Sequence, residues 1–119
     1  MLPIKVTDSG VLIIPLRADL DVGSRAATAW AIDRLLAAHR SSPVVVQLSD
    51  AAPSPAAVST VARTIRMCRD AGTQSAVVAA GAEARRTLRS GLGGVRAPDV
   101  HVTVHSAVAT LSATVGTAA

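Results

Sequence analysis

Few residues of this 119-residue sequence could carry out metal or acid–base chemistry, and the clearest candidates are two of its three histidines. His101 and His105 are four residues apart, a spacing that on one helix face would suit a zinc ion. The intervening Val102-Thr103-Val104 is typical of a strand, however, and four residues of strand span about 13 Å. One metal ion cannot bridge that distance, so we predict no metal site and no bound cofactor.

The other nucleophiles and acids lack the neighbours that catalysis needs. Cys68, the only cysteine, shares the apolar face of a predicted helix with Val61 and Ile65, which predicts a buried, unreactive thiol. The Gly91-Leu92-Gly93-Gly94 segment is not followed by the Lys-Ser/Thr pair of a phosphate-binding loop. The eight acidic residues are scattered, and no acid–base pair is identifiable. We therefore predict that the chain is not an enzyme.

Composition and charge argue against further classes of protein. The formal net charge is +4, carried by eleven Arg and one Lys, which reflects either GC-rich coding or a surface that faces anions. With one aromatic residue and no run of Lys or Arg, we predict no nucleic-acid binding. No stretch reaches the ~18 apolar residues of a membrane span, and Met1–Asp8 has no signal-peptide pattern. We expect a cytoplasmic protein, in agreement with its lone cysteine.

Helices alternate with apolar strands along the chain. The predicted strands are Ile4–Thr7, Val11–Pro15, Val44–Leu48, Ser75–Ala80 and Val100–Val104, and the predicted helices are Ser24–Arg40, Pro55–Ala71, Ala82–Ser90 and Ser106–Ala113. The first two strands flank Asp8-Ser9-Gly10 and are expected to form a hairpin. This order predicts one α/β domain over residues 1–119, a mixed, largely parallel β-sheet covered by about four helices. Its core spans residues 4–111, and residues 112–119 are expected to fray.

The clearest helix start is Ser54-Pro55, because serine is a favoured N-cap and proline a favoured first helical residue. At about 100° per residue, the following helix has an apolar face of Val58, Val61, Ala62, Ile65 and Cys68. Thr60, Arg63 and Met67 fall on the opposite side, which predicts that they are exposed. An outward methionine among polar residues suits an adaptable protein contact, and incidental exposure is the alternative.

Two further surface features each have two interpretations. Trp30 falls off the apolar face of its helix and marks either an interface or a side chain that covers a neighbouring element. Arg85, Arg86 and Arg89 share one side of a later helix. They form either a solvated charged face or a contact for an acidic partner.

Four segments carry a resemblance to a known family. They are Ala18-Asp19-Leu20-Asp21-Val22, Gln47-Leu48-Ser49 at the end of a strand, Ser54-Pro55-Ala56-Ala57-Val58 at a helix start, and Leu88 to Gly93. They stand where the STAS domain family, which includes the anti-sigma-factor antagonists, has a Gly-Glu-Leu-Asp-like turn, Asp-Leu-Ser, Asp-Ser-x-Gly-Leu and a Leu-Gly-like segment. The order of elements is similar to that family from about Ile4 to Leu111.

The chain departs from this family at the serine that a partner kinase phosphorylates in most members. Depending on the register, Pro55 or Ala56 stands at that position, and neither has a hydroxyl group. If the phosphosite has been displaced, Ser54 is its candidate, although a capping role already accounts for this serine.

The resemblance implies a non-enzymatic protein–protein interaction module of bacterial signalling and transcription regulation. It would dock through the helix that starts at Ser54 onto an anti-sigma-factor kinase or a related regulator, without the usual serine switch. The residues expected to bind this partner are Ser54, Pro55, Ala56, Thr60, Arg63 and Met67. The alternatives are a structural or oligomerisation subunit of a larger signalling assembly, including a homodimer, and, as a third, an enzyme of flavodoxin-like layout.

Overall fold

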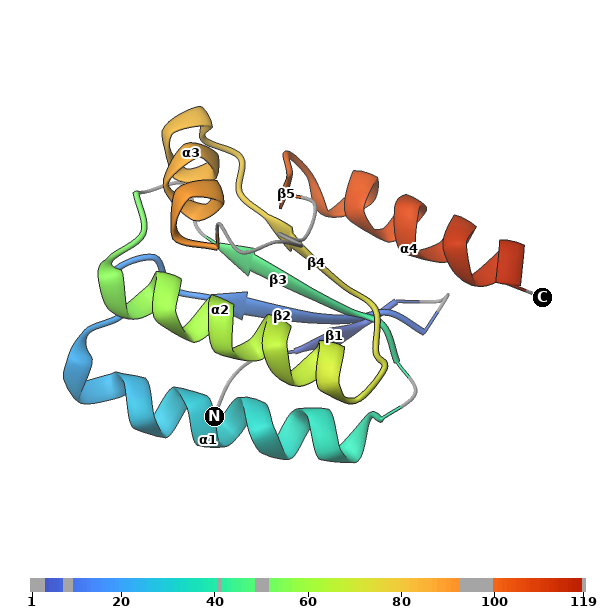
Figure 1. Cartoon of the computed structure of the whole chain (residues 1–119), viewed down its shortest axis with the longest axis horizontal. Helices are drawn as coiled ribbons and strands as arrows, with labels where there is room; N and C mark the ends of the chain where they lie inside the picture. The colour runs from blue at the N-terminus through green and yellow to red at the C-terminus, as the bar shows by residue number, and fades with distance from the viewer. Residues whose placement is uncertain (1–3, 8–9, 41, 49–51, 93–99, 119) are drawn as a thin grey trace.

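Strands and helices alternate in the predicted order. The computed structural model describes residues 4–7, 10–40, 42–48, 52–92 and 100–118, with residues 112–118 described by their backbone alone. The strands are β1 (Lys5–Val6), β2 (Leu12–Leu16), β3 (Val44–Leu48), β4 (Ser75–Val78) and β5 (Val100–His101). The helices are α1 (Val22–Ala38), α2 (Pro55–Asp70), α3 (Ala82–Gly91) and α4 (Val104–Ala118), as Figure 1 shows.

The described strands form a single sheet in the order β1-β2-β3-β4-β5. β1 runs antiparallel to β2, and each later neighbour pairs in parallel, with Ile14 opposite Val46 and Val46 opposite Val77. The predicted fold, a mixed and largely parallel sheet with four helices, is confirmed. Two residues of the predicted hairpin turn, Asp8 and Ser9, lie outside the described residues.

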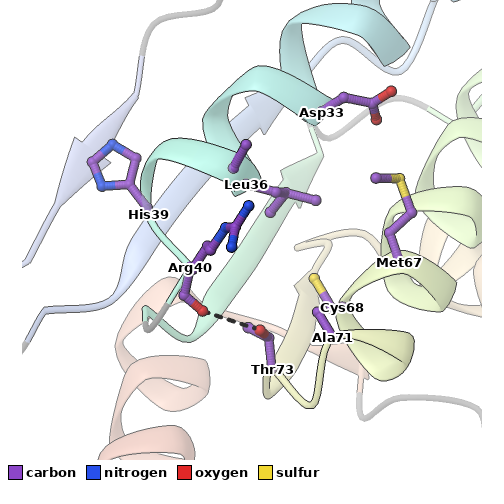
Figure 2. Close-up of a pocket in the computed structure, with 9 residues that line it drawn as sticks. Asp33, Leu36, His39, Arg40, Met67, Cys68, Ala71 and Thr73 are labelled. Atoms are coloured by element: carbon purple, nitrogen blue, oxygen red, sulfur yellow. Dashed lines mark hydrogen bonds between the residues drawn. The ribbon is translucent and has the colours of Figure 1, made fainter.

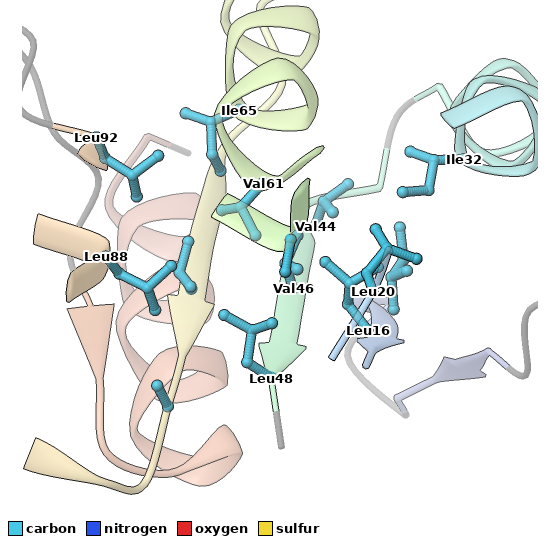
Figure 3. Packing of buried hydrophobic residues seen from close by; sticks show 14 of the residues in the cluster. Leu16, Leu20, Ile32, Val44, Val46, Leu48, Val61, Ile65, Leu88 and Leu92 are labelled. Atoms are coloured by element: carbon cyan, nitrogen blue, oxygen red, sulfur yellow. The ribbon is translucent and has the colours of Figure 1, made fainter. Parts of the chain in front are cut away.

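The two faces of the sheet are covered unequally. Because parallel crossovers between successive neighbours are right-handed, α1, α2 and α3 fall on the same face, and α4 returns across the other (Figure 1). The first face packs strand residues such as Val44 and Val46 against Ile32, Val61 and Leu88 (Figure 3). The second face packs Val11, Ile13, Val45, Ala76 and Val78 against Ala107 and Leu111 of α4. Val44–Val46 is apolar throughout because both of its faces are buried.

Helix α1 is held to the sheet by a narrow contact. It begins at Val22, two residues before the predicted start, because the Asp21 side chain accepts a hydrogen bond from the backbone N–H of Ser24 at 2.7 Å. Among its residues only Ile32 is fully buried, and Leu36 packs against the same core cluster. Most of the surface of α1 therefore faces outward.

Helix α2 has strong signals at both ends. It begins after Ser54 as predicted, with Pro55 as its first residue. At its other end, Gly72 has φ +70° and donates from its N–H to the carbonyl of Arg69 at 3.0 Å. The N–H of Thr73 donates to the carbonyl of Cys68 at 2.7 Å, which completes a Schellman motif.

Replacing Gly72 with alanine is expected to lower the free energy of unfolding by about 1–2 kcal/mol, because the left-handed conformation crowds a Cβ atom. Urea unfolding measures this loss. Gly23→Ala is the matched control: Gly23 lies in helix α1 without a positive φ, and a Cβ there would meet only Asp21 Oδ1 at 3.4 Å. A loss of similar size in both variants would contradict the conformational explanation.

The carboxyl-terminal elements differ from the prediction. β5 ends at His101, and α4 begins at Val104, because Thr103 Oγ1 accepts a hydrogen bond from the N–H of Ser106 at 3.1 Å and caps the helix. The predicted strand to Val104 and the predicted helix start at Ser106 are therefore wrong. α4 continues to Ala118, beyond the predicted helix end at Ala113. No helix in the described part of the chain is long and apolar enough to cross a membrane.

Candidate interaction surface at the start of helix α2

The start of α2 is tied to the turn that follows β2. The carboxyl ends of the parallel strands β2 and β3 lie at the same edge of the sheet, which brings their loops together. The backbone N–H of Ser54 donates to the carbonyl of Ala18 at 2.7 Å, and its hydroxyl donates to the carbonyl of Leu20 at 2.5 Å. Buried side chains of Ala18 and Leu20 hold this turn against the core. The position of the first turn of α2 thus depends on a segment 34 residues earlier.

The hydroxyl of Ser54 makes two hydrogen bonds. Besides donating to Leu20, its oxygen accepts from the backbone N–H of Ala57 at 3.1 Å and thereby caps α2. Pro55 beside it is exposed, whereas Ala56 is only 6% exposed. Of the three residues predicted at this end of the helix, Pro55 is the one whose side chain faces freely outward.

A shallow groove lies between the first half of α2 and helix α3. Its volume is about 640 Å³, which is within the range of small-ligand clefts. Its walls are Pro53, Pro55, Val58 and Ser59 on one side and Arg86, Thr87, Ser90 and Gly91 on the other. The two helices approach so closely at one end that a Cβ atom on Gly91 would lie 2.4 Å from Val58 Cγ1. The exposed Pro55 therefore stands at the edge of a concave surface.

The three arginines of α3 do not form one free surface. The guanidinium of Arg85 donates to the carbonyls of Ala79 and Ala80, at 2.9 and 2.6 Å, and fastens α3 to the end of β4. Arg86 is exposed and lines the groove, while Arg89 is exposed but does not line it. The three arginines therefore do not act as one contact surface, because only Arg86 faces the groove.

The exposed face predicted for α2 is wrong at Thr60. This residue is 2% exposed, and its hydroxyl donates to the carbonyl of Ala56 at 2.9 Å. Thr64, one turn later, is buried in the same way and donates to the carbonyl of Thr60. A threonine that satisfies its hydroxyl within its own helix can be buried without an unpaired polar group. Thr60 and Ala56 are therefore not available for contact with a partner.

Arg63 and Met67 lie on the flank of α2 that faces α1, away from the Ser54 end. Arg63 forms a bidentate ion pair with Asp33 of α1, with distances of 2.6 and 2.9 Å. The hydrogen bonds from Arg63 lower the pKa of the Asp33 carboxyl. Since both side chains remain more than a third exposed, water screens the pair and its contribution to stability is small.

Met67 lines a pocket between the carboxyl-terminal halves of α1 and α2. The pocket has a volume of about 410 Å³, and Figure 2 shows Met67 and Cys68 of α2 facing Leu36 of α1 across it. The pocket is also lined by Asp33, Ala37, His39, Arg40, Ala71 and Thr73. Cys68 is 1% exposed, and burial raises the pKa of its thiol to about 11, so the predicted burial of this cysteine is confirmed.

His101 and His105 lie on different elements and not on one strand as predicted. His105 lies in the first turn of α4 and not on a strand with His101, so the distance of about 13 Å expected for a strand does not apply. The Nδ1 atom of His101 lies 2.9 Å from Ser106 Oγ, so this ring has a hydrogen-bond partner in the first turn of α4. No group of three or more metal-binding side chains converges among the described residues.

Several residues of this surface were missed from the sequence. The carbonyls of Ala18 and Leu20, the ion pair with Asp33 and the groove position of Arg86 all depend on contacts between distant segments. One of them, Ser59, could have been found from the sequence. It is four residues after Pro55, and residues four apart share a helix face. Gly93 and Gly94 of the predicted glycine-rich loop lie outside the described residues.

Comparison with known proteins agrees with this architecture. A Ser-to-Glu variant of RsbS from Moorella thermoacetica has a similar structure, with a TM-score of 0.79 over 96% of this chain and 97% of that chain, at 12% identity. The NMR structure of the protein TM1081 has a TM-score of 0.67 over 92% of this chain and 86% of that chain, at 17% identity. No curated protein sequence matches significantly. The STAS domain family model matches residues 3–107, and the chain therefore belongs to the STAS domain family.

Proposed function

We propose that the protein is a non-enzymatic interaction module of bacterial signalling, similar to an anti-sigma-factor antagonist, that acts in the cytoplasm. It docks through the start of α2 onto an anti-sigma-factor kinase or a related regulator. The observation that carries this proposal is the exposed Pro55 at the edge of the α2–α3 groove, on an element held in place by Ser54. The family membership and the fold shared with RsbS support it.

The charge of this surface favours an acidic partner. Among the described residues that line the groove, Arg86 is the only charged one. The positive end of the α2 dipole points toward the same corner as Pro55. An acidic segment of the partner that enters the groove would meet the guanidinium of Arg86.

The usual serine switch is absent under this proposal. Pro55 and Ala56 cannot accept a phosphate, and the hydroxyl of Ser54 is engaged with both Ala57 and Leu20. A phosphate on Ser54 would remove the donor to Leu20 and add about −2 charge at a partly buried position. Docking is therefore constitutive or controlled by another event. A role as a structural subunit of a larger assembly is the second candidate, and the exposed face of α1 favours it.

The test compares two arginines of one helix. With the kinase-like partner purified, Arg86→Glu is expected to raise the Kd at least about tenfold, because it opposes an acidic segment in the groove. Arg89→Glu makes the same charge change outside the groove and is expected to leave binding nearly unchanged. Incubation with the partner and ATP is expected to add no phosphate by intact mass. Equal effects of both variants, or stoichiometric phosphate on Ser54 with partner release, would contradict the proposal.

A further inference from the structure

The outer face of α1 carries an unusual apolar side chain. Trp30 is 61% exposed, and the other large hydrophobic residues exposed in the described part of the chain are three valines. Its ring contacts the guanidinium of Arg34, whose carbon lies 4.9 Å from the ring centroid. An indole left largely in water gives up much of the burial energy that a tryptophan can provide. Such a residue is characteristic of the centre of an interface.

One residue of the pocket beside Met67 lies on the face of α1 that carries Trp30. Ala37, on its wall, is seven residues after Trp30, and residues seven apart lie on nearly the same helix face. The hollow of about 410 Å³ between Leu36, Met67 and Ala71 is mostly apolar and within the size range that holds small ring compounds. Protein interiors are normally close-packed, so an apolar hollow of this size between two helices is suited to an inserted side chain.

We propose that two copies of this chain associate through antiparallel α1 helices, with Trp30 of each copy inserted in the pocket of the other. A two-fold axis makes such an interface self-complementary, because each contact occurs twice. If Trp30 lies opposite the partner's Ala37, the axis passes midway between Asp33 and Arg34. Asp33 of one copy, which also pairs with Arg63 of its own chain, then lies near the partner's Arg34, so the charges nearest the axis are of opposite sign.

This surface is distinct from the groove proposed for the signalling partner. The groove lies between the first half of α2 and α3, whereas the pocket lies between the second halves of α1 and α2. α1 has 17 residues, roughly 25 Å of helix, and with the adjoining flank of α2 it forms a small interface. Interfaces of this size are weak, so a Kd in the micromolar range is expected.

The experiment uses the purified chain alone. Sedimentation equilibrium from low to high micromolar concentration is expected to show a monomer–dimer equilibrium. The sequence has one Trp and no Phe or Tyr, so intrinsic fluorescence reports on Trp30 alone. The emission of Trp30 is expected to shift to the blue as dimers form. Trp30→Ala is expected to abolish dimers while leaving the Tm of the monomer nearly unchanged, because this side chain is exposed.

Two further variants isolate the contact. Ala37→Glu, which places a charge at the mouth of the pocket, is expected to abolish self-association. Mixing it with Trp30→Ala is expected to restore weak pairing, because one intact tryptophan and one intact pocket meet again. Val22→Ala is the control and is expected to leave dimers intact. Val22 is 74% exposed on α1, but in the antiparallel pairing it lies beyond the end of the partner's α1 at Ala38 and contacts no residue of that helix. Arg86→Glu is expected to leave dimers intact, which separates this proposal from partner docking.

Three results would overturn the proposal. One is a monomer at every concentration. Another is a dimer that persists in Trp30→Ala. The third is a small molecule retained by the monomer, found by native mass spectrometry, whose binding is lost in Ala37→Glu.

Discussion

The thiol of Cys68 is expected to react with a disulfide reagent at least about 100-fold more slowly in the folded chain than in the unfolded chain at neutral pH. The thiolate is the reactive form, and burial raises the pKa of this thiol from 9.0 to about 11. A rise of about two pKa units leaves about one hundredth of the thiolate at a given pH below both values. Because the residue is also 1% exposed, the reagent has little access to it.

The labelling rate is measured with and without urea, and Cys68→Ser supplies the background. The raised pKa also has a consequence for stability. Folding favours the neutral thiol. The stability that Cys68 contributes to the folded state is therefore fully present below about pH 9 and is lost as the pH rises through about 11. Folded chain that labels as fast as unfolded chain would show that the pocket between α1 and α2 admits reagent to the sulfur.

Replacing Ser54 with alanine is expected to lower the free energy of unfolding by about 1–3 kcal/mol. Loss of an N-cap side chain costs about 0.5–2 kcal/mol. Loss of the donor to Leu20 removes a further hydrogen bond and leaves a partly buried carbonyl without that partner. The change therefore weakens both α2 and the link between α2 and the turn after β2.

Urea unfolding of a matched pair of variants measures this loss. Ser59→Ala removes the same hydroxyl from an exposed position of the same helix and is expected to change stability by less than about 0.5 kcal/mol. Ser54→Thr keeps a hydroxyl and is expected to retain most of the stability. If Ser54→Ala is as stable as the parent chain and loses partner regulation instead, the serine serves signalling and not the fold.

The secondary structure could be predicted well where the signals are local. The bounds of β3 were predicted as Val44–Leu48 and are confirmed, because a run of β-branched residues between polar segments is characteristic of a buried strand. The start of α2 was predicted for a similar reason, since serine and proline favour adjacent positions of a helix start. Predictions failed at the start of α4, where Val102 to Val104 is apolar enough for a strand but Thr103 caps a helix.

The composition of the candidate site was less predictable. The outward face assigned to α2 placed Thr60 with Arg63 and Met67, because at about 100° per residue all three fall opposite an apolar face that includes Val58 and Ile65. In the structure Thr60 is buried, Arg63 is paired with Asp33, and Met67 belongs to a separate pocket. These three positions therefore do not form one surface, and only the start of the helix remains as the proposed docking site.

The sequence by itself determined which segments form strands and helices, the alternation that places them in one mixed sheet, and the family resemblance. These depend on residue types within a few positions of one another. Only the tertiary structure decided that Ser54 is bonded to Leu20, that Arg86 and not Arg89 lines the groove, and that Trp30 stays exposed. The physical reason is that each of these depends on where separate elements pack, and a hydroxyl, a guanidinium or an indole can be satisfied by several different neighbours.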